Sequence, residues 1–199
     1  MKVCHSTTPQ GEKHTDDDLT RQWNSIDWEN VRSDVNRLQT RIAKATQERK
    51  WNLVKRLSYL LTHSHSAKLL AVRIVTQNKG KRTPGVDGEL WTTAAVKMRA
   101  ARSLTDRQYR AQPLRRIYIP KPGKTTKRPI SIPTMYDRAM QALYAQALQP
   151  IAETTADPRS FGFRLFRCAQ DASRYAFTCL MSQGSAPWVL EGDIKGCFD

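Results

Sequence analysis

The sequence lacks several features that would place it at once in a class of protein. It contains no run of about 18 apolar residues, so it predicts no membrane span, and its first residues lack the apolar stretch of a secretory signal. Its composition excludes collagen-like and low-complexity chains. The cysteines form no C-x-x-C pair, which disfavours a disulfide scaffold, and we expect reduced thiols in a cytoplasmic protein: Cys4, Cys168, Cys179 and Cys197.

Acidic residues are scarce in the middle of the chain. The 199 residues carry a net charge of +15, but residues 31–130 alone hold 24 basic and 5 acidic residues, a net charge of +19. Such a field attracts polyanions and gives them salt-dependent affinity. The basic residues are interleaved with predicted helices and strands, which favours a nucleic-acid partner over a merely solvated basic surface. No single basic amphipathic helix carries the excess, which disfavours a membrane surface.

The spacing of apolar residues predicts an α+β chain. Steps of three and four predict a helix that begins at a Ser25 or Asp27 cap and reaches Ala45, and further helices over 51–61, 66–77, 92–103, 135–149 and 168–182. Alternation predicts strands over 115–120 and 128–133 that form a hairpin, and an apolar run predicts a buried strand over 188–190. The polar residues 1–22 are expected to form a disordered arm. This order of elements is an α+β pattern.

The tip of the predicted hairpin is basic. Lys121 and Arg128 flank it, and Lys124 and Lys127 lie closer to the turn. An ammonium group binds phosphate as a point charge, and a guanidinium group can bind it through two hydrogen bonds. The tip is therefore predicted to bind a triphosphate, or, alternatively, to grip only the backbone of a nucleic acid.

A carboxylate follows the predicted strand near the end of the sequence. Asp193 comes three residues after Leu190, and Gly196 would let the backbone approach a ligand. A carboxylate at the end of a buried strand suits Mg²⁺, and two such ions can stabilise both oxygens of a phosphoryl displacement. The alternative is that Asp193 or Asp199 caps a following helix.

Four strings in order make the sequence resemble a group II intron-encoded reverse transcriptase/maturase: TPGVDG, RRIYIPKPGKTTKRPISIPTMYDRAMQALYAQALQPIAE, RSFGFRLFRCAQDA and WVLEGDIKGCFD. The likeness covers roughly residues 22–199. It implies a right-hand polymerase fold in which residues 23–105 are a helical basic N-terminal region, 106–187 the fingers and 188–199 the start of a truncated palm. The polar arm, residues 1–22, precedes them.

The resemblance also implies roles for single residues. Lys121 and Arg128 would meet the triphosphate of the incoming dNTP, with Lys127 as the alternative to Arg128. Asp193 would be the first catalytic carboxylate and would bind Mg²⁺, aided by the backbone of Ile194. Three residues would lie against the nucleotide, and the aromatic ring among them would exclude a ribose 2′-OH: Gly196, Cys197 and Phe198.

The partners implied by the resemblance are nucleic acids. Intron RNA, together with an RNA template and a DNA primer, would be bound by basic residues before and at the base of the hairpin: Lys79, Lys81, Arg82, Arg115 and Arg116. No membrane partner is implied.

The sequence departs from the family at two points. Leu165 stands where the family has proline after the G-F-R stretch, and no Y-x-D-D turn, which supplies further metal carboxylates, is present. One carboxylate cannot build a two-metal site, so we expect no polymerisation by this polypeptide alone. It would then be a truncated gene product, one piece of a split protein or part of a longer chain. The alternatives of another class are a non-catalytic RNA-binding maturase-like module and an unfolded relic.

Overall fold

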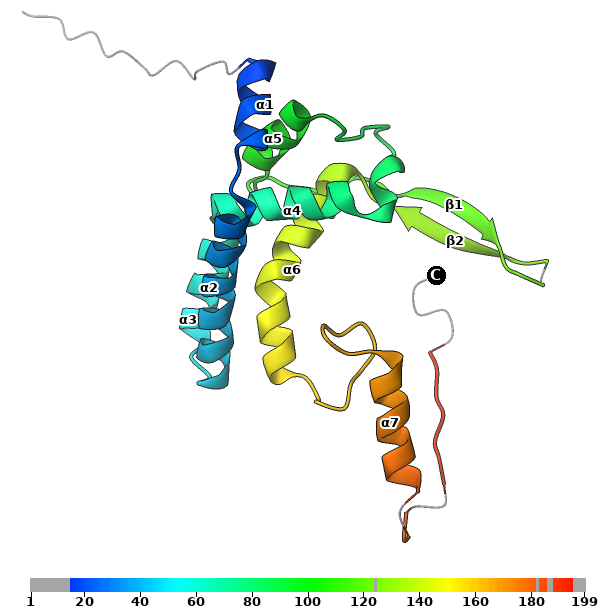
Figure 1. Ribbon diagram of the computed structural model, residues 1–199. Coiled ribbons are helices and arrows are strands. Elements are labelled where there is room, and N and C mark those ends of the chain that lie inside the picture. Colours follow the sequence, from blue (N-terminus) through cyan, green and yellow to red (C-terminus); the bar gives the residue numbers. More distant parts are fainter. Residues whose placement is uncertain (1–14, 124, 182, 186–187, 195–199) are drawn as a thin grey trace, which may run out of the picture.

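The computed structural model describes residues 15–123, 125–181, 183–185 and 188–194 (Figure 1). The described part is mostly helical with one two-stranded sheet, which confirms the α+β class. Its elements are α1 (Asp16–Asn24), α2 (Trp28–Gln47), α3 (Trp51–His63), α4 (His65–Gln77), the 3-10 helix η1 (Lys79–Arg82), α5 (Ala94–Ser103), β1 (Arg115–Pro120), β2 (Lys127–Ile132), α6 (Met135–Thr155) and α7 (Ala169–Leu180).

The core lies among the helices that precede the hairpin and the helix that follows it. Helix α2 packs against α3 and α6, α4 packs against α5 and α6, and α1 lies along α5. The apolar residues spaced by three and four on these helices are buried together, including Ile42, Leu61, Val72 and Met140. Helix α6 therefore brings the chain after the hairpin back into the N-terminal helical body (Figure 1).

Side-chain caps fix where two of these helices begin. The carboxylate of Asp27 accepts hydrogen bonds from the backbone N–H groups of Glu29 and Asn30 at 3.0 and 3.1 Å, so Asp27, and not Ser25, caps α2. Thr134 caps α6 by accepting from the N–H of Asp137 at 3.1 Å. Both caps satisfy N–H groups that have no partner within the helix.

The prediction of a disordered arm over residues 1–22 is wrong for residues 16–22, which belong to α1. Thr15 caps this helix, and its three aspartates occupy the first turn, where negative charge is stabilising. Leu19 is buried, and Asp16 pairs with Arg99 of α5. The helix forms because α5 provides both an apolar surface and a cation, which its own polar sequence does not reveal. Residues 1–14 lie outside the described residues.

The prediction of a buried strand over residues 188–190 is also wrong. The segment forms no ladder, and Trp188, Val189 and Leu190 are 88%, 73% and 97% exposed. A strand needs the backbone of a neighbour for its hydrogen bonds, and β1 paired with β2 is the whole sheet of the described residues. No described strand is therefore available to pair with this apolar run.

Candidate nucleic-acid interface

The hairpin projects from the helical body as an antiparallel arm (Figure 1). Its register pairs Arg115 with Ile132 at the base and Pro120 with Lys127 near the tip. The N–H of Lys121 donates to the carbonyl of Thr126 at 3.2 Å, which extends the ladder one step beyond the strands. Gly123, with φ +68°, supplies the left-handed backbone of the turn. The hairpin prediction is thus confirmed, with β2 starting one residue earlier than expected.

The register assigns the basic residues of the tip to two faces. Arg128 lies opposite Ile119, and Lys127 lies opposite Pro120. Because side chains alternate along a strand, Lys121 shares a face with Ile119 and hence with Arg128. Lys127 belongs to the other face. The geometry therefore brings together the first pair that the sequence analysis assigned to phosphate, Lys121 and Arg128, and separates the alternative, Lys127, from it.

Arg138, in the first turn of α6, holds the loop that precedes the hairpin. Its guanidinium group donates to the carbonyls of Gly80 at 3.0 Å, Thr83 at 2.6 Å and Pro133 at 3.0 Å. Burial lowers the pKa of this arginine, which Asp87 partly offsets. One side chain thus ties η1, the following loop and the end of β2 to the same helix, and we call this set of contacts the Arg138 clamp.

The loop also packs directly on the backbone at the start of α6. A Cβ atom on Gly85 would lie 2.6 Å from the Cα atom of Thr134 and 2.8 Å from its backbone nitrogen. Real side chains do not approach a backbone this closely, so only glycine fits here. Arg115 adds a hydrogen bond from its guanidinium group to the carbonyl of Pro84 at 3.3 Å.

These contacts bring together the two groups of residues that the sequence analysis assigned to RNA. Lys79, Lys81 and Arg82 lie on η1, and Arg115 and Arg116 lie at the base of β1. The Arg138 clamp and the Arg115–Pro84 bond join the two segments, and all five basic residues are solvent-exposed. We call the five residues the basic interface.

A buried carboxylate fixes the other side of the same turn. Asp137 accepts hydrogen bonds from the hydroxyls of Tyr109 at 2.6 Å and Thr134 at 2.7 Å, and from the N–H of Gln112 at 3.3 Å. Burial opposes ionisation, but these donors outweigh it and the pKa of Asp137 is lowered. Burial, together with the bond to Asp137, raises the pKa of Tyr109 to about 12. The network anchors the chain leading into β1.

Sequence reasoning missed Arg138, Asp137 and Tyr109 as residues that position the interface. A signal was present for one of them, because Thr134 and Asp137 have the spacing of a helix-capping pair. Nothing in the sequence indicates that Arg138 bonds carbonyls more than 50 residues away.

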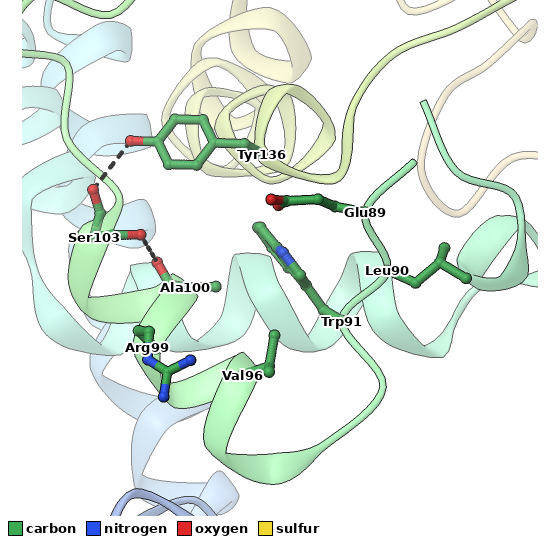
Figure 2. A pocket seen from close by; sticks show the side chains of 8 residues that line it. All are labelled: Glu89, Leu90, Trp91, Val96, Arg99, Ala100, Ser103 and Tyr136. Atoms are coloured by element: carbon green, nitrogen blue, oxygen red, sulfur yellow. Dashed lines mark hydrogen bonds between the residues drawn. The ribbon is translucent and has the colours of Figure 1, made fainter. Parts of the chain in front are cut away.

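An open cavity of about 520 Å³ lies beside this network, between α5 and the start of α6 (Figure 2). The rings of Trp91 and Tyr136 and the carboxylate of Glu89 line it, and Tyr136 donates to the carbonyl of Ser103 at 3.0 Å. Arg99, also at its rim, is paired with Asp16. Its walls thus join α5 to α6, and the cavity contains none of the residues assigned to the nucleotide.

The described interactions do not join Asp193 to the hairpin. Asp193 is exposed, as is Ile194, and no described hydrogen bond, ion pair or cavity joins it to Lys121 or Arg128. After α7 the chain reverses direction, and residues 188–194 run back along an extended path (Figure 1). Gly196, Cys197 and Phe198 lie outside the described residues.

The metal prediction can be tested on the donor atoms in the described ranges. No group of three histidine, cysteine, aspartate or glutamate side chains suited to a metal ion occurs there. Asp193 alone does not complete a magnesium site. Nor does any helix in the described part have the length and apolarity needed to cross a membrane.

Comparisons with known proteins match most of the chain. Residues 23–104 match the family described as the N-terminal domain of reverse transcriptase, and residues 119–199 match reverse transcriptase (RNA-dependent DNA polymerase). Protein YkfC of Escherichia coli K12 is 39% identical over 137 residues, which are 65% of this chain and 35% of that protein.

Several relatives are named after introns, among them proteins of Lactococcus lactis and Schizosaccharomyces pombe. The group II intron-encoded protein LtrA of Lactococcus lactis is 36% identical over 165 residues, 80% of this chain and 26% of that protein. An uncharacterized 91 kDa protein in cob intron of Schizosaccharomyces pombe is 31% identical over 133 residues, 66% of this chain and 16% of that protein. The chain spans 35% of the length of YkfC and 26% of that of LtrA.

Proposed function

The chain belongs to the reverse transcriptases, as a segment of the group II intron-encoded kind, and we propose that it forms the RNA-binding region, the fingers and the start of the palm of an RNA-directed DNA polymerase. In the complete right-hand polymerase it would bind intron RNA and an RNA template with its DNA primer. The proposed division is residues 23–105 for the helical N-terminal region, 106–187 for the fingers and 188–199 for the palm.

The observation that carries the RNA-binding part is the basic interface. Its five cations come from two segments more than 30 residues apart, and the Arg138 clamp and the Arg115–Pro84 bond hold those segments together. Cations fixed relative to one another bind a polyanion at a smaller entropic cost than cations on a mobile tail. The surrounding residues 31–130 add long-range attraction through their net charge of +19.

The nucleotide-binding part is proposed for the tip of the hairpin. Lys121 and Arg128 share a face of the arm and would bind the triphosphate of a dNTP, with Arg128 able to make two parallel hydrogen bonds. Gly196, Cys197 and Phe198 are proposed to contact the same nucleotide.

Asp193 is proposed as a metal carboxylate of the complete polymerase, with the carbonyl of Ile194 beside it. Reverse transcriptases generally use a divalent metal, and Mg²⁺ is our proposal for it. Such an ion, when bound, stabilises the attacking and leaving oxygens of nucleotidyl transfer. Asp193 is a single carboxylate, so further ligands must complete the site.

Salt-dependent binding tests the RNA part. For single-stranded RNA, log K falls with log salt by about 0.7 for each phosphate contact, so the five residues, which can contact at most five phosphates, give a slope of up to about −3.5. Replacing the five residues of the basic interface by glutamine should remove most of that slope. A matched control removes the same charge from exposed positions on α2 and α3: Arg32, Arg37, Arg41, Lys44 and Lys55. A flat salt dependence of the unaltered chain, or equal losses in both variants, would refute the proposed interface.

Template-primed dNTP incorporation tests the catalytic part. A polymerase reconstituted from this chain and the remaining palm and thumb segments of a relative should lose activity on Asp193→Ala. Activity that survives the substitution would remove Asp193 from the metal site. The second candidate, non-catalytic RNA binding, rests on the same basic interface, needs nothing from Asp193, and would be favoured by tight RNA binding with no incorporation in the unaltered reconstituted enzyme.

A further inference from the structure

A second, smaller cavity lies between η1 and α5. Its volume is about 190 Å³. Four segments contribute to its wall: the end of α4, η1, the stretch 90–92 and α5. The residues that line it are Thr76, Lys81, Arg82, Leu90, Trp91, Thr92 and Lys97.

Three cations converge on this cavity. Lys81 and Arg82 come from η1, and Lys97 comes from α5, fifteen or more positions later in the chain. No lining residue is acidic, and none of the three forms an ion pair with a carboxylate in the part of the chain that the structure describes. Like charges held close together repel each other, so an arrangement of this kind favours a bound anion.

The rest of the wall strengthens the attraction. Trp91 is only 8% exposed and gives the cavity an apolar side, where a charge interaction is weakened less by water. The volume is below the 300–1,000 Å³ or so typical of pockets for drug-sized ligands. It suits a small anion such as a phosphate group.

We propose that this cavity binds one backbone phosphate of an RNA strand, with Lys97, Lys81 and Arg82 as its cationic ligands. The proposal rests on the proposed RNA-binding function and adds Lys97, Trp91 and Thr92 to the surface that would contact RNA. Because a phosphate carries no sequence information, binding here would fix the path of the strand past η1 without selecting its bases.

Charge removal at Lys97 tests the proposal. Lys97→Gln leaves Lys81 and Arg82 at the phosphate and should reduce the salt slope for a single-stranded RNA by up to about 0.7, which is at most about a fivefold loss of affinity at 0.1 M salt relative to a 1 M reference. Lys97→Arg keeps the charge and should retain most of the affinity. The matched control is Lys55→Gln on α3, an exposed lysine that should change little. Circular dichroism melts of each 199-residue variant verify that it folds.

The indole N–H signal of Trp91 gives a direct readout by NMR, assigned with Trp91→Phe. It should move on addition of the RNA at micromolar concentration and of inorganic phosphate or AMP only at millimolar concentration, and Lys97→Gln should shift both responses to higher concentration. A signal that responds to AMP but not to RNA would overturn the proposal in favour of a free-nucleotide site. A steep slope for the unaltered chain with equal effects of Lys97→Gln and Lys55→Gln would overturn the pocket alone, whereas a flat slope would overturn the proposed function itself.

Discussion

Replacing Gly85 by alanine should destabilise the protein, although it adds a single methyl group. The new Cβ atom would lie 2.6 and 2.8 Å from the Cα and nitrogen atoms of Thr134 and 3.0 Å from the carbonyl carbon of Pro133. All three neighbours are backbone atoms, which cannot turn away as a long side chain can. The loop must therefore move off the start of α6.

The expected cost follows from the contacts that this movement would disturb. Overpacking a tight site typically costs about 1–3 kcal/mol, and the Arg138 clamp on the same loop would be strained as well. We expect about 2 kcal/mol. In a chain of this size that corresponds to a fall in Tm of about 4–8 °C.

Thermal unfolding followed by circular dichroism measures the effect, with Gly162→Ala as the matched control. A Cβ atom on Gly162 meets nothing within 4 Å, and its φ is not in the left-handed region. That change should be neutral or stabilise by up to about 1 kcal/mol, because alanine restricts the unfolded chain. Equal melting temperatures for the two variants would show that the loop does not pack on α6 as described.

Four other changes have defined outcomes. Arg138→Lys replaces the forked guanidinium by a single ammonium group, which cannot reach all three carbonyls, and should cost about 2 kcal/mol in urea unfolding. An unchanged midpoint would contradict the clamp. Asp137→Asn should cost about 1–3 kcal/mol at pH 7. Because the pKa of Asp137 is lowered in the folded state, its contribution to stability is present above its ordinary pKa of 3.8 and is lost as the pH falls through the folded value. The free energies of unfolding of the unaltered chain and the variant should therefore converge in acid, and curves that stay parallel would contradict this. Tyr109, whose pKa is raised to about 12, contributes stability below its ordinary pKa of 10.0 that is lost as the pH rises toward 12, and Tyr109→Phe should remove this alkaline loss, with absorbance at 295 nm reporting the ionisation. Arg128→Gln should raise the KM for dNTP of the reconstituted polymerase about tenfold and Lys127→Gln much less, because Arg128 shares the face of Lys121; the reverse order would contradict the register argument.

The helices of the core could be predicted because each carries its own signal. Apolar residues at steps of three and four on α2, α3 and α4 are the residues that are buried, and the Asp27 cap is visible in the sequence. Helix α1 could not be predicted in the same way. Its burial of Leu19 and its pairing with Arg99 depend on α5, which lies about 80 residues further along the chain.

The residues of the basic interface could be predicted from the sequence more readily than their arrangement in space. Basic residues on η1 and β1 stand out in the sequence, but the carbonyls that Arg138 binds do not, since a backbone acceptor looks the same at every position. The apolar run at 188–190 has strand composition without a described strand to pair with. Such a composition indicates that a segment favours an extended conformation, but a strand forms only where a neighbouring strand supplies hydrogen-bond partners.

Helix α6 has a mechanical consequence. Its 21 residues make a rod about 30 Å long. Near one end of this helix, Arg138 holds the loop that precedes the hairpin. Near the other end, Glu153 pairs with Arg164 and Arg167 of the segment leading to α7. A load applied to the hairpin by a moving strand would therefore be transmitted along this helix to the segment that holds Arg164 and Arg167, and the two ends would shift together rather than independently.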